Sequence, residues 1–561
     1  MADVLNKVKS DIREMVLAAA GRAVADGDFP KEILPDFSVE VPSDRNHGDF
    51  AVNAAMVWAR ALKKSPRMIA DIILSKIDKG GYIERLEIAG PGFINIFLSD
   101  SFYSDVVLSV LESGDNYGRS DYGKGKSVLV EFVSANPTGP MHIGNARGGA
   151  LGDSIAAAYD WAGFDVKREF YVNDAGNQIN KFKISLESRY LQLFDDSVEI
   201  PEDAYLGEDI VNHAKEFAKV HGDKYVCTSA EERQDALCDF ALPKNIKKLK
   251  TDLQKYRINY DCWYHESGLH QSGKVAEIIE KLKKSGYTYE SEGALWLKST
   301  EFGDEKDRVL LRANGVPTYL VPDIAYHYDK LVTRNYDLAI DILGADHHGY
   351  IARMMAALTA LGVDSNRLKI VIMQMVRLVK NGETYKLSKR SGKAVTLETL
   401  LDEVPIDAAR YVFNSKEPNT HLEFDLDLAV EQSSQNPVYY VQYAHARICS
   451  ILRNLSNEGI EPRSVTAEEL SCLTAPEERE LIRYISTLSE TIINAAECFD
   501  PAFLTRYAYD LATLFHKFYN SCRVKGEGEK LMQARLNLCL ATKITVANVL
   551  RMLKIDAPTE M

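Results

Sequence analysis

The chain has 561 residues, too many for one hydrophobic core, and this length predicts about three or four domains. Hydrophobic residues make up 46% and charged residues 26%, ordinary proportions that exclude a largely disordered or fibrous chain. The 81 acidic side chains outnumber the 67 basic ones, giving a formal charge of -14, so a nucleic-acid partner must bind local basic surfaces.

The sequence shows no targeting or membrane segment near its start. The longest apolar stretch there, residues 15–20, is too short for a signal-peptide core or a membrane span. The eight cysteines include no C-x-x-C pair, which argues against a zinc knuckle and against a dense disulfide framework. We therefore expect a soluble cytoplasmic protein without membrane contact.

Residues 1–118 are predicted to form a small domain of mixed α and β structure. An apolar spacing typical of one helix face opens this segment, and short apolar runs such as residues 93–97 follow. The turn-rich residues 114–118 predict the boundary that ends it.

Residues 119–430 alternate strand and helix patterns. A buried-strand pattern covers residues 128–133, a helical pattern runs from 145 to 161, and a second strand-like run covers 167–172. Further strands are predicted at 338–343 and 368–373. This alternation favours an α/β fold with a doubly wound, Rossmann-like parallel sheet.

Two helical segments accompany this sheet. Residues 181–260 are rich in charge and carry little strand signal, so they are predicted to be a helical insertion between the two halves of the sheet. Residues 431–561 show helical spacing at 478–493, 502–519 and 533–553, which predicts an all-α bundle. Within it, residues 501–561 hold nine basic and five acidic side chains, a local excess that points to a polyanion.

A turn at residues 136–145 lies between a predicted strand and a predicted helix. Its backbone N–H groups, the helix dipole, and the side chains of His142 and Asn145 could together hold a triphosphate. Gly144 would let a flat ring or a ribose approach the backbone. The alternative is a Gly/Pro loop with a surface histidine.

A basic segment at residues 386–393 contains four cations, including Lys386 and Lys389. A mobile loop of this kind can close on a leaving pyrophosphate and stabilise negative charge in the transition state. The alternative is a solvated charged loop.

Acidic residues form a third group. Glu131 lies in the first predicted strand of the sheet, Glu266 follows an aromatic run, and Tyr319 precedes Asp323 by four positions. Carboxylates in an apolar pocket are costly unless a cation pairs with them, and a guanidinium offers a planar fork to two of them. The alternative makes Asp323 a helix N-cap and Glu266 a surface residue.

Two other clusters need an interpretation. The adjacent histidines after Asp346 point apart and lack a third ligand, so we expect a polar contact to a cofactor and no bound metal. Tyr439, Tyr443 and Arg447 lie on a predicted helix, where they would serve as core packing or as a platform for base stacking.

The chain resembles the class I arginyl-tRNA synthetases of bacterial type, nearly from end to end. Residues 130–145 are similar to the strand and H-I-G-H signature of that family, and residues 386–390 to its K-M-S-K-S loop. Residues 171–176 and 343–350 match further blocks, and residues 436–447 resemble the opening of its anticodon-binding domain. Asn145 and Arg390 depart from the generic signatures, which have His and Ser there.

The resemblance implies roles for individual residues. His142, Asn145, Lys386 and Lys389 would be the catalytic residues, which contact the phosphates of ATP. The ATP site would also include Gly139, Pro140, Gly144, His347 and Ser388. Arginine would be bound by Glu131, Asn136, Glu266, Tyr319, Asp323 and Asp346, and tRNA by Tyr439, Gln442, Tyr443 and Arg447.

The resemblance also implies the reaction. The arginine carboxylate would attack Mg-ATP to form arginyl-adenylate, and the 2′-hydroxyl of the terminal ribose of the tRNA would then take the arginine. The N-terminal domain would meet the tRNA elbow and the C-terminal bundle the anticodon. We expect a monomer that uses ATP with Mg²⁺ as co-substrate and holds no tightly bound metal or organic cofactor. Alternatives are a class I synthetase for glutamine or lysine, and a non-catalytic tRNA-binding protein.

Overall fold

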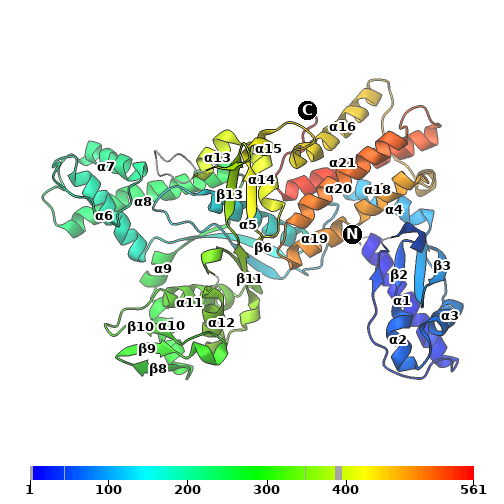
Figure 1. The fold of residues 1–561 in the computed structure, drawn as a ribbon, viewed down its shortest axis with the longest axis horizontal. Coiled ribbons are helices and arrows are strands. Elements are labelled where there is room, and N and C mark those ends of the chain that lie inside the picture. Colours follow the sequence, from blue (N-terminus) through cyan, green and yellow to red (C-terminus); the bar gives the residue numbers. More distant parts are fainter. Residues whose placement is uncertain (1–3, 43, 348, 386–394) are drawn as a thin grey trace.

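The computed structural model describes residues 4–42, 44–347, 349–385 and 395–561 (Figure 1). Four groups of elements are visible: an N-terminal α/β unit, a central sheet with its flanking elements, a helical extension far from the N-terminus, and a group of C-terminal helices. Within the described residues, none of the helices combines the length and hydropathy needed to cross a membrane.

The N-terminal unit packs helices against a four-stranded antiparallel sheet of order β1-β2-β4-β3. Its third helix starts where the Ser65 hydroxyl accepts a hydrogen bond from the Met68 N–H, with Pro66 in the first helical position. The elements are α1 (Val4–Ala25), β1 (Val39–Glu40), β2 (Phe50–Val52), α2 (Ala54–Leu62), α3 (Pro66–Lys76), β3 (Ile83–Ala89), β4 (Phe93–Leu98) and α4 (Asp100–Ser113).

The central sheet has five parallel strands in the order β12-β11-β5-β6-β7. The chain runs outward from β5 through β6 to β7 and then returns to β11 on the other side of β5. The carboxyl ends of β5 and β11 therefore form the switch point of a doubly wound sheet, so the predicted fold class is confirmed. The strands are β5 (Ser127–Glu131), β6 (Asp165–Val172), β7 (Cys262–His265), β11 (Leu338–Gly344) and β12 (Leu368–Met373).

Strand β5 is shorter than predicted. It ends at Glu131, because Val133 and Ser134 have φ angles of 68° and 40° and leave the extended conformation. The Ser134 hydroxyl donates to Glu131 Oε1 at 2.8 Å and accepts from the Tyr171 N–H at 3.1 Å. This left-handed turn re-aims the chain at the carboxyl end of the sheet, a position where backbone strain commonly accompanies function.

Two small sheets flank the central one. The antiparallel sheet β10-β9-β8 was missed by the sequence analysis, because its strands have only four residues each and are largely exposed along β8. The other sheet has the order β14-β13-β15. The elements around the central sheet are α5 (Ile143–Trp161), α9 (Glu266–Gln271), α10 (Lys274–Lys284), β8 (Thr288–Ser291), β9 (Ala294–Leu297), β10 (Arg308–Leu311), α11 (Leu320–Tyr328), the π-helical turn η4 (Asp329–Thr333), α12 (Tyr350–Ala360), β13 (Val376–Lys380), β14 (Glu383–Thr384), α13 (Leu397–Glu403), α14 (Ile406–Asn414), β15 (Leu422–Asp425) and α15 (Leu426–Val430).

The helical extension lies between β6 and β7 in the chain. Its helices enclose a core of their own, which includes Phe182, Ile210, Phe217 and Leu237. The extension consists of α6 (Gly176–Leu191), α7 (Glu208–His221) and α8 (Ala230–Lys255).

The C-terminal helices differ from the prediction at one point. The helical spacing of residues 478–493 predicted one helix, but the structure has two, which meet at Thr487, whose hydroxyl donates to the Tyr484 carbonyl at 2.8 Å. The helices are α16 (Pro437–Ser456), α17 (Ala467–Leu470), α18 (Pro476–Ser486), α19 (Leu488–Glu497), α20 (Ala502–Ser521) and α21 (Glu529–Met552).

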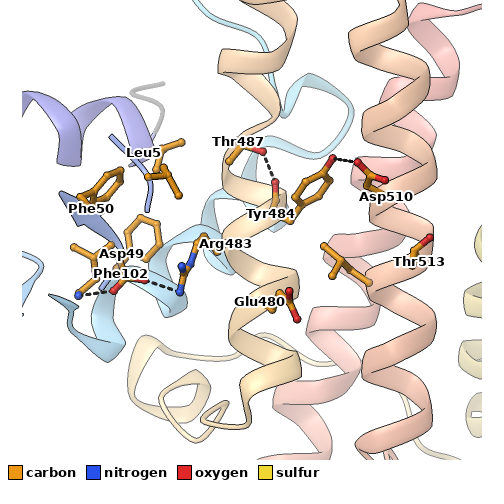
Figure 2. A pocket seen from close by; sticks show the side chains of 13 residues that line it. Leu5, Asp49, Phe50, Phe102, Glu480, Arg483, Tyr484, Thr487, Asp510 and Thr513 are labelled. Carbon is orange, nitrogen blue, oxygen red and sulfur yellow. Dashed lines mark hydrogen bonds and ion pairs between the residues drawn. The ribbon is translucent and has the colours of Figure 1, made fainter. Parts of the chain in front are cut away.

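The N-terminal unit meets the C-terminal helices around a cavity of about 390 Å³ (Figure 2). At its edge Arg483 of α18 reaches Asp49, with 2.6 Å between Nη2 and Oδ1. On the other side the Tyr484 hydroxyl donates to Asp510 at 3.2 Å. Arg483 of α18 thus joins the first unit to the C-terminal helices, and Tyr484 joins α18 to α20.

Candidate active site

The predicted phosphate-binding turn is held by a reciprocal helix cap. His142 is the N-cap of α5, and its Nδ1 accepts from the Gly144 N–H at 3.1 Å. In return, Asn145 Oδ1 accepts from the His142 N–H at 3.0 Å. The cap explains why α5 begins at Ile143, two residues earlier than predicted, and it fixes both side chains at the positive end of the helix dipole.

The structure gives a second reason for Gly144. A Cβ atom at this position would lie 2.9 Å from Cε1 of the His142 ring. The absence of a side chain therefore leaves room for the capping histidine, and the expected approach of a ribose or a flat ring stays a prediction.

The second motif precedes a segment that the structure joins to the first. Lys386, Ser388 and Lys389 lie outside the described residues. The chain that follows is described, and Thr396 forms an antiparallel bridge with His142. The Ile143 N–H donates to the Val395 carbonyl at 3.0 Å, and the Leu397 N–H donates to the Met141 carbonyl at 2.8 Å. The segment after the basic motif is thus paired directly with the phosphate-binding turn.

The predicted acidic residues converge from three elements. Glu131 ends β5, Glu266 opens α9, and Asp323 lies in the first turn of α11. Burial raises the pKa of Asp323 to about 7; His327 opposes this, while Glu266 and Glu131 reinforce it. The carboxyl of Asp323 therefore lies in a desolvated space that it shares with two other carboxyls.

The structure contradicts the alternative interpretation, in which Asp323 is a helix N-cap and Glu266 is a surface residue. Asp323 is the fourth residue of α11, whose N-cap is Tyr319, so it is not a helix N-cap. Glu266 is only 8% exposed, so it is not a surface residue. Its Oε1 lies 3.5 Å from Nε2 of His270 one turn later on α9.

Glu131 differs from Asp323 because the protein supplies its cation. The fully buried Lys330 of η4 places Nζ 2.5 Å from Glu131 Oε2 and 2.7 Å from Asp341 Oδ1. The argument that Glu131 needs a cationic substrate is therefore wrong, since Lys330 already satisfies that need. Among the described residues, no cation forms an ion pair with Asp323, and its carboxyl is available to a ligand.

Several residues of this site were missed by the sequence analysis. The His327 Nε2 atom lies 2.6 Å from Asp341 Oδ2, and both residues are buried. The ring of Tyr171 packs 4.5 Å from that of Tyr326, and burial together with Glu266 and Asp323 raises the pKa of its hydroxyl. Lys330 and Asp341 carry no sequence signal of their own, although Tyr171 opens one of the matched blocks.

Tyr350 lies between the acidic pocket and His347. Burial is the main cause that raises the pKa of this tyrosine, and Asp323 and Asp341 add to it. Its ring lies 6.3 Å from that of His327 and 6.2 Å from that of His347. Burial lowers the pKa of His142, and the charge of Asp346 partly opposes that shift. The charge of Asp346 therefore acts on the histidine of the predicted phosphate-binding turn.

The other predicted binding residues are more exposed than the acidic ones. Tyr319 is 61% exposed, and a Cβ atom on Gly176 would lie 3.7 Å from its ring, which places it at the start of α6. Asn136 and Pro140 are exposed on the turn, and Gly139 is half-buried. In the described part of the chain, no group of three or more metal-ligating side chains is found. His348 lies outside that part.

The predicted tRNA contacts lie along α16. Tyr443 is exposed, and its ring lies 5.9 Å from that of His516 on α20. The guanidinium of Arg447 lies 4.6 Å from the ring centre of Tyr519. Tyr439 is half-buried. Gln442 turns inward, where its amide donates to Asp407 Oδ2 at 2.7 Å and to the Asp556 carbonyl at 2.9 Å.

Comparison with known proteins identifies the family. Residues 106–451 match the family described as tRNA synthetases class I (R), catalytic domain. Residues 6–98 match the arginyl tRNA synthetase N terminal domain, and residues 441–561 match the DALR anticodon binding domain. The chain belongs to the arginyl-tRNA synthetase family. The predicted family is therefore confirmed, and the class I synthetases use ATP as a substrate.

Members of this family resemble the chain over its whole length. The arginine–tRNA ligase of Caldanaerobacter subterraneus is 52% identical, and that of Ruminiclostridium cellulolyticum is 51% identical. In both cases the comparison covers 100% of each chain. The solved structure of the Thermus thermophilus arginyl-tRNA synthetase has a TM-score of 0.76 and 22% identity, covering 99% of this chain and 100% of the other. That structure supports the fold.

Proposed function

We propose that this chain is an enzyme that joins L-arginine to its cognate tRNA at the expense of ATP. One observation carries the choice of amino acid: Asp323 shares a buried pocket with Glu266 and Glu131, yet no described cation pairs with it. A guanidinium satisfies such a pocket, because it brings a permanent charge and a planar fork of donors.

Arginine activation is the first step. The carboxylate of arginine attacks the α-phosphorus of Mg-ATP, a bond to the α-phosphate forms, and pyrophosphate leaves. His142 and Asn145 would bind the phosphates at the start of α5, together with Gly139, Pro140 and Gly144. His347, Lys386, Ser388 and Lys389 would complete the ATP site. Such a reaction depends mainly on positioning and on stabilisation of charge, so no protein nucleophile is required.

The arginine side chain would point to Asp323 and Glu266, with Tyr319 at the rim and Asn136 on the α-amino group. Glu131 would line the same pocket, where Lys330 pairs with it. Asp346 would act from beside the phosphate-binding turn.

Transfer to tRNA is the second step. The 2′-hydroxyl of the terminal ribose attacks the carbonyl carbon of the adenylate, and AMP leaves. Residues 1–118 would contact the tRNA elbow, residues 119–430 the acceptor end, and residues 431–561 the anticodon, chiefly through Tyr443 and Arg447. We also propose that the protein acts as a monomer in the cytoplasm.

The test is arginine-dependent exchange between ATP and pyrophosphate, measured with and without cognate tRNA. We expect exchange with arginine and tRNA, and none with glutamine or lysine. Neutral glutamine would leave Asp323 and Glu266 without a cation, and the ammonium of lysine lacks the planar fork of donors that a guanidinium offers to carboxylates. Exchange with lysine or glutamine alone would assign another amino acid, and no exchange under any condition would leave only a tRNA-binding role.

A further inference from the structure

The helix α8 of the helical extension contacts the phosphate-binding turn through a buried amide. Asn245 is 8% exposed. Its Nδ2 donates to the Pro137 carbonyl at 2.9 Å, and its Oδ1 lies 2.7 Å from His213 Nε2 on α7. Because the amide oxygen can only accept, His213 must donate from Nε2. His213 of α7 thus donates to Asn245, and Asn245 in turn donates to the phosphate-binding turn.

The same helix also contacts the chain that follows the basic motif. Lys248, three residues after Asn245, pairs with Glu398 at 3.0 Å, and Lys255 pairs with Asp402 at 3.3 Å. Both acids belong to α13, which starts just after Thr396, the partner of His142. One helix of the extension therefore contacts both segments that surround the site.

The Pro137 carbonyl and Gly139 are parts of the turn that lie close to α8 and α7. Pro137 carries no N–H group, so its carbonyl is the backbone group through which this residue can be held. A Cβ atom on Gly139 would lie 3.9 Å from Asp209 Oδ2, which shows that α7 also approaches the turn closely. Without the amide of Asn245, a buried carbonyl would lose its donor and the turn could move away from α8.

We propose that Asn245 is a positioning residue for ATP, which sets the place of the phosphate-binding turn through the Pro137 carbonyl. This role rests on the proposed function, because it concerns the rate of arginine activation. Activation depends on the alignment of the α-phosphate, so a small displacement of the turn lowers kcat even though Asn245 lies on another element.

The test compares Asn245→Asp with the wild type in exchange between ATP and pyrophosphate, with tRNA present. The substitution is isosteric, but a carboxylate cannot donate a hydrogen bond and would place one of its oxygens against the Pro137 carbonyl oxygen. We expect kcat to fall about 10- to 100-fold with a much smaller change in the KM for arginine, because the carboxyls proposed to bind the arginine side chain come from β5, α9 and α11, and only Asn136 comes from the turn. Asn245→Ala, which removes the donor without adding charge, should lower kcat less.

A matched control is Asn537→Asp in α21. Asn537 is also buried, and its amide donates to the Arg463 and Gln533 carbonyls at 3.0 and 2.9 Å. We expect a comparable fall in Tm for both Asp variants and an unchanged kcat for the control only. If Asn245→Asp does not fold, Asn245→Ala carries the test, and a kcat equal to that of the control would overturn the role. An inactive wild type would overturn the proposed function itself and this role with it.

Discussion

Two carboxyls in the same pocket differ in their partners. Glu131 is neutralised by Lys330, which the fold brings to it from 199 positions away in the chain. Asp323 lies among Glu131 and Glu266 with a raised pKa and no ion pair with a described cation. Glu131 thus has a cation within the protein, whereas Asp323 is the carboxyl that we propose for a ligand with positive charge.

Arginine binding should therefore depend on pH. The pKa of Asp323 is raised to about 7, so the carboxyl is mostly ionised at pH 8 and mostly protonated at pH 6. We expect the Kd for arginine to rise about tenfold from pH 8 to pH 6, measured by isothermal titration calorimetry.

Asp323→Asn is the control for this pH dependence. It should bind arginine weakly at both pH values, and a wild type with a flat profile would contradict the assignment. The ligand-free protein should show the opposite trend. Because the folded pKa lies above the unfolded value, the contribution of Asp323 to stability decreases as the pH rises from about 4 to about 7.

Replacing Lys330 should destabilise the fold. Lys330→Met leaves Glu131 and Asp341 buried without their cation, and we expect a loss of roughly 3–5 kcal/mol in the free energy of unfolding. Urea denaturation at pH 8 measures this loss. The matched control is Lys244→Met, which breaks the exposed pair with Glu216 and should change stability by less than about 1 kcal/mol. Equal losses for the two variants would show that the buried ion pairs contribute no more to the free energy of unfolding than the exposed pair does.

At the scale of elements, the ends of strands and helices decide the chemistry. The apolar run through Val133 predicted a longer β5, whereas the left-handed turn at Val133 and Ser134 ends it at Glu131. The start of α5 was nearly correct, because a cap depends on residues within one turn of each other. Both boundaries were thus predicted to within two residues, and the residues that set them, a cap and a left-handed turn, became visible only in the structure.

Helix α16 presents different faces to the protein and to solvent. Val441, Ala444 and Ile448 are buried, whereas Tyr443 is 41% exposed beside His516. Gln442, expected to contact tRNA, binds Asp407 and the chain near Asp556. Of the predicted contacts, Tyr443 has the ring that a nucleobase could reach.

Tyr443→Ala should therefore weaken tRNA binding. Stacking of one base on an aromatic ring accounts for about 1–3 kcal/mol, so we expect the KM for tRNA to rise about tenfold or more, with the KM for arginine unchanged. Aminoacylation kinetics measure both constants. Tyr289→Ala is the control, since Tyr289 is also exposed and stacks on Trp296, but it lies in β8 away from α16. A tRNA effect of the same size in the control would argue against the platform.

At the scale of the whole molecule, ion pairs attach the N-terminal unit to the C-terminal helices. Lys9 pairs with Glu490 at 2.7 Å, and Arg483 reaches the buried Asp49 beside the cavity between these parts (Figure 2). Asp49 also accepts from the Leu98 N–H and from the Tyr103 hydroxyl within its own unit. The position of the first unit thus depends on side chains that are distant in sequence.

A double-mutant cycle can measure this attachment. We expect Asp49→Asn and Arg483→Met to be non-additive, with a coupling energy of about 1–3 kcal/mol in the free energy of unfolding. Pairing either variant with Lys244→Met provides the control, because that site is remote and the effects should add. Additive effects of Asp49→Asn and Arg483→Met would mean that the ion pair does not hold the two parts together.

The sequence by itself determined the family, the parallel sheet, the phosphate-binding turn and the types of the acidic residues. These features depend on short segments whose spacing, caps and apolar runs act within a few residues of each other. Only the tertiary structure decided that Glu131 pairs with Lys330, that Asp323 has no ion pair with a described cation, and that Asn245 donates to the Pro137 carbonyl. Such pairings join residues separated by about a hundred positions or more, and no local pattern encodes which distant partner the fold will bring to a buried charge.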